Sequence, residues 1–181
     1  MTTIIASIEA EYRRYKTLGE GAIRQLTERE LAAEISGENN SVATIAWHIA
    51  GNLKSRFTDF LTSDGEKPWR NRETEFEARQ VTQAELAEKW DDGWSTLFKT
   101  LDELSEPDIS RTVTIRGREL TVLEALHRSL AHVSYHVGQI VYIAKSMRGD
   151  DWEYLSIPPG KSTEYNRNPT LERGPSVPKG T

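Results

Sequence analysis

The sequence predicts an all-α protein, a four-helix bundle followed by an irregular tail rich in proline and glycine. Four long segments repeat apolar residues at steps of three and four, which is the spacing of one helix face. Three Thr-x-x-Glu capping boxes mark helix starts. Five of the seven prolines follow Gly149, where no helical period continues. We therefore expect a bundle over residues 1–148 and a tail over residues 149–181 that packs on the bundle or is partly disordered.

The first half of the chain contains two of the expected helices. Apolar residues recur at helical spacing from Ile4 to Leu26, so the first helix is expected there. The box Thr27-Glu-Arg-Glu30 then opens a short helical turn. A second helix is expected from Val42 to Leu61, with Asn40 or Ser41 as its cap.

The second half contains a long loop and two further helices. Residues 62–81 have no helical period, and a loop of that length in a compact domain often carries function. A third helix is expected from the box Thr82-Gln-Ala-Glu85 to Leu104. Residues 111–118 alternate around Gly117 and predict a short extended or hairpin-like link. The fourth helix is expected from Val122 to Met147, after a third capping box.

Composition excludes several classes of function. The chain has no cysteine, so disulfides, thiolate zinc sites and cysteine nucleophiles are excluded. The net charge of −5, without a stripe of basic residues, argues against a nucleic-acid partner. No apolar run approaches the roughly 20 residues that span a bilayer, and the start has no basic region typical of a signal peptide. We therefore expect a cytoplasmic protein with no membrane partner.

Three of the four histidines form a candidate metal site. His132 and His136 are four residues apart, so on a helix they point to one side, about 40° apart. His48 lies in an apolar stretch, where a buried imidazole needs a polar partner, and a metal shared with the other two would supply one. Three imidazoles with one open position are typical of catalytic zinc, although nickel or iron also accepts them. The alternative is ordinary exposed or hydrogen-bonded histidines. His127 points away from the pair and is expected at the surface or against the tail.

The motifs around these histidines resemble a known family. With Ala46-Trp-His-Ile-Ala50 on the second helix and His132-x-x-x-His136-Val-Gly-Gln139 on the fourth, residues 1–147 resemble the DinB/YfiT-like metalloenzymes. The last helix of that family often reads H-x3-H-R-G-Q, and Val137 replaces the Arg here. The resemblance implies one divalent ion, zinc or nickel, held by His48, His132 and His136. It points to an uncharacterised branch, which gives no reaction to carry over.

Characterised members of the resembled family are transferases and isomerases that use a low-molecular-weight thiol such as bacillithiol, mycothiol or glutathione. We therefore expect a metal-dependent transferase that uses such a thiol on small electrophiles, as a homodimer. Because the chain has no cysteine, the thiol must arrive as a cosubstrate. Two alternatives stay open: a hydrolase in which the ion activates water, and a non-catalytic metal-binding or dimerising stress protein. The substrate, the thiol and the native metal are not determined by the sequence.

The remaining polar and aromatic residues have plainer interpretations. Trp47, Trp90 and Trp94 lie at helical spacing and are expected in the core. Tyr135 and Tyr142 are expected to pack rather than to donate protons. The charged residues of the long loop are expected to form a solvated surface rather than an anion site; they are Arg70, Arg72, Glu73 and Glu75. Polar tail residues would reach the site only if the tail folds back over it; they are Lys161, Ser162, Glu164, Tyr165 and Asn166.

Overall fold

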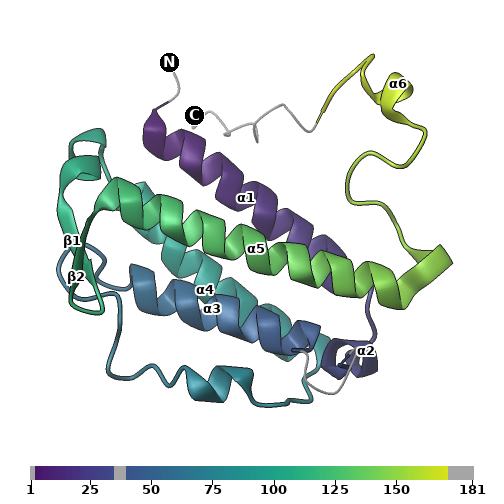
Figure 1. The fold of residues 1–181 in the computed structure, drawn as a ribbon, viewed down its shortest axis with the longest axis horizontal. Helices are drawn as coiled ribbons and strands as arrows, with labels where there is room; N and C mark the ends of the chain where they lie inside the picture. Colours follow the sequence, from purple (N-terminus) through teal and green to yellow (C-terminus); the bar gives the residue numbers. More distant parts are fainter. Residues whose placement is uncertain (1–2, 35–39, 171–181) are drawn as a thin grey trace.

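The structure, a computed structural model, describes residues 3–34 and 40–170. Over these residues the chain is mostly helical, which confirms the all-α class. The described part contains six α-helices, three short 3-10 turns and one two-stranded hairpin (Figure 1). The two additional helices are short pieces, α2 (Glu28–Ala32) and α6 (Ser162–Tyr165).

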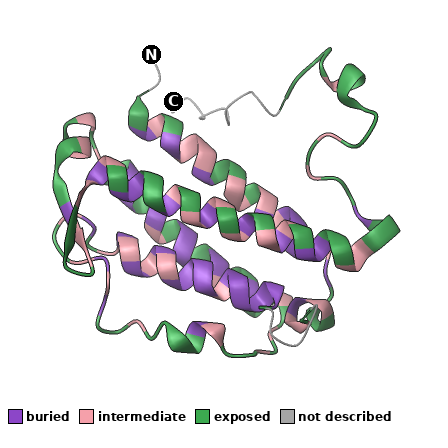
Figure 2. Ribbon diagram, viewed as in Figure 1, coloured by how far each residue is buried: buried purple, intermediate pink, exposed green. Residues whose placement is uncertain are grey.

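Four long helices lie side by side and enclose the core (Figures 1 and 2). They are α1 (Ile4–Ile23), α3 (Val42–Phe57), α4 (Gln83–Glu103) and α5 (Val122–Arg148). Helix α3 packs against both α4 and α5, and α1 packs mainly against α5. Their apolar stripes meet in one cluster, whose largest fully buried members include Tyr12, Leu53, Leu86, Trp94, Leu97, Leu126 and Ile140.

The capping signals predict the helix starts correctly, whereas two of the predicted C-terminal ends differ from the structure. The boxes at Thr27, Thr82 and Thr121 all form, and Ser41 caps α3. The predicted end of the second helix at Leu61 is wrong. Helix α3 stops four residues earlier because the backbone of the next residue is extended, and the hydroxyl of Thr100 donates a 2.8 Å hydrogen bond to the last helical carbonyl. The first helix likewise ends three residues before the expected Leu26, which is nevertheless buried.

The expected link before the last helix is a β-hairpin. Strand β1 (Thr112–Ile115) pairs antiparallel with β2 (Arg118–Thr121). The turn residues Arg116 and Gly117 have φ values of 54° and 69°, as a two-residue type I′ turn requires. Asp64 in the long loop accepts a hydrogen bond from each of these two backbone N–H groups, both at 2.8 Å. The long loop and the hairpin are therefore fastened together.

The rest of the long loop lies against α3. It contains the 3-10 turn η1 (Glu73–Phe76), which contacts α3. After α4, a second 3-10 turn, η2 (Glu106–Ser110), leads into the hairpin. The loop thus contacts His48 of α3 from one side, and α5 contacts it from the other.

The first residues after α5 pack on the long helices, and the later ones do not. After the turn η3 (Gly149–Asp151), Trp152 is buried and Leu155 packs next to Gly21 of α1. The helix α6 then stands apart from the long helices (Figure 1). Residues 171–181 of the predicted tail lie outside the described part. No helix in the described residues is long and apolar enough to cross a membrane.

Candidate metal centre

The helix α3 holds His48 in the interior of the protein. The cap at Ser41 and the apolar residues on both sides of the histidine keep this part of the chain helical and buried. Only 3% of His48 is exposed to solvent. An imidazole buried to that degree needs partners for both ring nitrogens, because an unpaired polar group in the interior is costly. The structure supplies one partner to each nitrogen.

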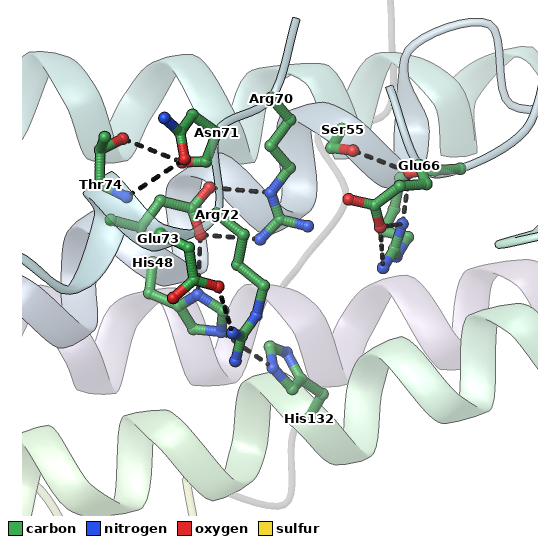
Figure 3. Close-up of polar contacts among 12 residues, drawn as sticks. His48, Ser55, Glu66, Arg70, Asn71, Arg72, Glu73, Thr74 and His132 are labelled. Carbon is green, nitrogen blue, oxygen red and sulfur yellow. Dashed lines mark hydrogen bonds and ion pairs between the residues drawn. The ribbon is translucent and has the colours of Figure 1, made fainter. Parts of the chain in front are cut away.

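The partner of His48 Nε2 is α5, which presents His132 and His136 one turn apart. His48 Nε2 lies 3.2 Å from His132 Nε2 (Figure 3). One ligand nitrogen from each of the three histidines lies within 4.8 Å of the other two. The structure thus brings together all three predicted site residues, from two helices 84 residues apart in the chain.

The donor set fits a divalent metal ion. Two nitrogens bound to tetrahedral zinc at about 2.0–2.1 Å lie about 3.3 Å apart, close to the His48–His132 separation. Ring movements on the order of 1 Å bring the third nitrogen to the same spacing. Without an ion, the contact between His48 and His132 is a hydrogen bond in which one ring donates to the other. Three histidine ligands leave a further coordination position of a tetrahedral ion open.

The partner of His48 Nδ1 is Glu75, which the sequence did not identify. His48 Nδ1 donates to Glu75 Oε2 at 2.8 Å. Arg70 grips the same carboxylate through Nε and Nη2, both at 2.8 Å. Both side chains are buried, with 2% of Arg70 and 7% of Glu75 exposed. The expectation that these two residues form a solvated surface is therefore wrong, because the 3-10 turn directs Glu75 inward to His48.

A glycine on α3 makes room for this carboxylate. A Cβ at Gly51 would lie 2.8 Å from Glu75 Cδ, closer than real Cβ contacts. The chain therefore accepts Glu75 against α3 only because residue 51 has no side chain. Carboxylate–histidine pairs of this kind fix the tautomer and orientation of a metal-binding ring, so that Nε2 of His48 is the nitrogen free to bind an ion.

The other two histidines differ in their supporting contacts. His136 Nδ1 lies 2.7 Å from Gln139 Oε1, one turn further along α5. His132 Nδ1 is buried and has no hydrogen-bond partner among the described protein residues. Two of the three rings are thus oriented by neighbours through Nδ1, while His132 is held by packing and by its contact with His48.

Burial and nearby positive charge keep the α5 histidines neutral. Burial lowers the pKa of His132 to about 3, together with the neighbouring His136, His48, Arg70 and Arg56. Burial also lowers the pKa of His136, against the opposing effect of its bond to Gln139. Burial acts to raise the pKa of Glu75, but Arg70 and His48 outweigh it and the net shift is downward. At neutral pH His132 and His136 are therefore unprotonated, which is the form that binds metal, and the supporting carboxylate of Glu75 is ionised.

The three histidines open into a pocket of about 480 Å³, a typical size for a small-molecule site. Its walls come from α3, the long loop, the hairpin and the first half of α5. Phe76 packs on the His48 ring at a centroid distance of 4.6 Å. The apolar part of the lining consists of Phe57, Phe60, Phe76, Ile115, Leu120 and Ala125.

Several other candidate residues lie outside the pocket. His127 is exposed and belongs neither to the histidine cluster nor to the lining, as expected. Trp90 and Trp94 are core residues as predicted, whereas Trp47 is only partly buried. The prediction that the two α5 tyrosines pack is wrong, since Tyr135 and Tyr142 are 64% and 71% exposed. The tail residues Lys161, Ser162, Glu164, Tyr165 and Asn166 do not line the pocket.

Sequence reasoning also missed four arginines of the pocket, Arg56, Arg116, Arg118 and Arg128. One signal was available. Arg128 precedes His132 by four residues, so it continues the stripe of the two histidines along α5. Arg118 and Glu75 had no comparable signal, because one lies in a hairpin and the other in an aperiodic loop, and only the folded chain brings them to the site.

Comparisons with known proteins place the chain by fold and by family. A solved structure described as a conserved protein from Enterococcus faecalis matches 83% of this chain and 99% of its own, with a TM-score of 0.60. At 19% identity this likeness shows the fold alone. Comparison with curated proteins gives no match. The model of a family described as a protein of unknown function, DUF1572, matches residues 2–161, and the chain therefore belongs to the DUF1572 family.

Proposed function

We propose that the protein binds one divalent metal ion, zinc or nickel, through His48, His132 and His136, and uses it to transfer a low-molecular-weight thiol to a small electrophile. The observation that carries the proposal is the meeting of three imidazoles at a pocket of small-molecule size. A bound ion would supply positive charge that lowers the pKa of a thiol or water in the open position. We further propose that α1, α3, α4 and α5 form the four-helix bundle of the DinB/YfiT-like proteins.

The residues around the histidines have separable roles in this proposal. Arg70 holds Glu75, and Glu75 holds the ring of His48, so the orientation of one ligand is set by a buried ion pair. The side-chain oxygen of Gln139 orients the ring of His136 through a hydrogen bond. Phe76 covers the His48 ring and keeps water from that side. Only the pocket side is left for a ligand to approach.

The lining favours a thiol over water as the group that is activated. No aspartate or glutamate lines the pocket within the described residues, so a metal-dependent hydrolase would have no carboxylate there to accept a proton from water. A free thiol loses its proton near pH 8.5 without help, far more readily than water does. The chain has no cysteine of its own, so the thiol is a cosubstrate. We keep hydrolysis as the alternative that the experiment must separate.

The metal proposal is tested by elemental analysis of protein purified without chelator. We expect up to one zinc or nickel ion per chain in the wild type, a large loss in His132→Ala and His136→Ala, and no loss in His127→Ala. The control is matched, because His127 lies on the same helix outside the cluster. Equal losses in all three variants, or a wild type that takes up no added metal, would contradict the proposal.

The reaction class is tested by calorimetry with bacillithiol, mycothiol, glutathione and cysteine in two buffers of different ionisation heat. A thiol that binds as a thiolate releases a proton, so the measured heat depends on the buffer. We expect binding that needs the metal and disappears in His48→Ala. Metal-dependent ester or amide hydrolysis without binding of any thiol would favour the hydrolase instead. The expected homodimer is tested separately by sedimentation.

A further inference from the structure

The pocket beside the histidines is strongly cationic in a chain whose net charge is −5. Every charged side chain in its lining, apart from the histidines, is an arginine within the described residues. Six arginines contribute: Arg56, Arg70, Arg72, Arg116, Arg118 and Arg128. These arginines come from four separate parts of the chain, namely α3, the long loop, the hairpin and α5. Their gathering at one pocket, in an otherwise acidic protein, indicates a site that attracts negative charge.

Three of these arginines are firmly paired. Glu66 accepts hydrogen bonds from Arg56 and from Arg116, the latter at 2.8 Å. Arg70 is committed to Glu75 beneath His48. These three guanidinium groups hold the loop and the hairpin in place, and their charges are largely compensated by protein carboxylates.

The other three arginines are free or nearly free. Arg72 has one loose ion pair, at 3.4 Å, with the exposed Glu73, and its guanidinium group lies over the Phe76 ring. The guanidinium groups of Arg118 and Arg128 make no hydrogen bond or ion pair with any residue in the described part of the chain. Four carboxylates lie beside these arginines: Asp64, Glu66, Glu73 and Glu75. The six arginines therefore leave an excess of two positive charges before any metal ion is counted.

The free arginines lie within reach of the histidines. Arg128 is one turn of α5 before His132, which places the two Cα atoms about 6 Å apart along the helix axis. Arg118 begins β2, on the hairpin that forms another wall of the same pocket. Aromatic and aliphatic side chains line the same pocket, and among them the rings of Phe57 and Phe60 contact each other.

We propose that this pocket binds a small organic anion whose carboxylate or phosphate group is held by Arg118 and Arg128, while its apolar body contacts the phenylalanines. Guanidinium groups suit this role because each presents a planar fork of N–H donors that matches a carboxylate or phosphate. The anionic group would lie about one helical turn from the metal position. This inference names the substrate class of the proposed function and rests on it only for the role of the ion.

The test uses three probes that share a phenyl ring: benzoate, phenyl phosphate and benzyl alcohol. Binding is measured by calorimetry on the full chain, as purified and after addition of zinc. The variant is Arg118→Gln/Arg128→Gln, and the matched control is Arg111→Gln. Arg111 is an exposed arginine just before the hairpin that does not line the pocket. Circular dichroism should show all proteins equally helical, since Arg118 and Arg128 are exposed.

We expect the wild type and Arg111→Gln to bind an anionic probe at least about tenfold more tightly than benzyl alcohol, because bonds to charged groups are the strong ones. The double variant should lose that preference. Tighter binding of phenyl phosphate than of benzoate would identify phosphate as the natural group, and the reverse order a carboxylate. Anion binding that the double variant retains, equal binding of all three probes, or no binding at all would overturn the inference.

These outcomes are separate from those of the proposed function. Arginine-dependent binding of an anion by protein that takes up no metal even after addition of zinc would support the anion site and contradict the metal proposal. Conversely, a protein that binds zinc and a neutral thiol, but shows no preference for anionic probes, would keep the metal proposal and remove this one.

Discussion

Glu75 accepts a 2.8 Å hydrogen bond from His48 Nδ1 while Arg70 grips the same carboxylate, so a loop residue 27 positions away sets the orientation of the buried histidine on α3. Because of this contact, the long loop is part of the candidate site and does more than connect α3 to α4. It also makes the metal affinity of the protein depend on a residue that would not touch the ion.

Replacement of Glu75 by glutamine tests this dependence. We expect Glu75→Gln to weaken zinc binding about 10- to 100-fold, the usual cost of losing a supporting partner of a metal-binding histidine. Stability should also fall by about 3 kcal/mol, because Arg70 is buried and would keep only part of its partner. Chelator competition measures the affinity, and urea unfolding of the metal-free protein measures the stability.

The control for this change is Glu73→Gln, two residues earlier in the same 3-10 turn. Glu73 is exposed and has only its loose pair with Arg72. We expect its substitution to leave zinc affinity and stability within error of the wild type. Equal effects of the two substitutions would contradict the role assigned to Glu75.

The histidines and the long helices were predictable because their signals are local. Helical spacing places His132 and His136 on one side of α5, and the capping boxes give the helix starts from four residues each. His48 was assigned from its apolar surroundings and from a family resemblance. Its pairing with α5 depends on how α3 and α5 pack, and one sequence alone does not give that packing.

Glu75 and Arg118 were not predictable for a physical reason. The loop has no period, so nothing distinguishes Glu75, which is buried, from Glu73, which is exposed. The difference arises in the folded chain, where Gly51 leaves space on α3 for one carboxylate. Long-range polar contacts of this type become visible only when the loop is placed against the helix.

Two glycine-to-alanine substitutions test whether Glu75 needs the space beside Gly51. In Gly51→Ala the new methyl group would meet Glu75 Cδ at 2.8 Å, so Glu75 must move and zinc affinity should fall as in Glu75→Gln. In Gly138→Ala the methyl group meets nothing within 4 Å. Both positions are helical, so each substitution should stabilise the protein by up to about 1 kcal/mol through helix propensity. The difference in zinc affinity between the two variants therefore measures the contact of residue 51 with Glu75. A Gly51→Ala protein that binds zinc as tightly as Gly138→Ala would contradict the assignment.

Removal of the metal should lower the thermal stability of the protein without unfolding it. The core of the long helices is built from apolar side chains and does not depend on an ion, unlike that of a zinc finger. With free zinc at a thousand times its Kd, the bound ion contributes about 4 kcal/mol, so chelation should lower Tm by about 10 °C. Circular dichroism of the chelated protein at 25 °C should remain helical. A coil spectrum, or an unchanged Tm, would contradict this expectation.

The last prediction concerns Asp64, which fastens the long loop to the hairpin turn that precedes Arg118. Burial acts to raise the pKa of Asp64, but hydrogen bonds from the backbone N–H groups of Glu66, Gly117 and Arg116 outweigh it, so the net shift is downward. A carboxyl group with a lowered pKa stabilises the folded state above its unfolded value of 3.8. That contribution is lost as the pH falls through the lower, folded value.

The N–H resonances of Arg116 and Gly117 should report this titration directly, because each donates a 2.8 Å bond to the carboxylate. We expect NMR midpoints below 3.8 in the wild type and no such transition in Asp64→Asn, which has no titrating group at this position. The same variant should bind the anionic phenyl probes more weakly than the wild type at pH 7. Its Arg118 is intact, but the turn that places this arginine in the pocket wall has lost its charged acceptor. A midpoint at or above 3.8 would show that the three N–H groups do not stabilise the carboxylate, and unchanged anion binding would show that the turn holds Arg118 without it.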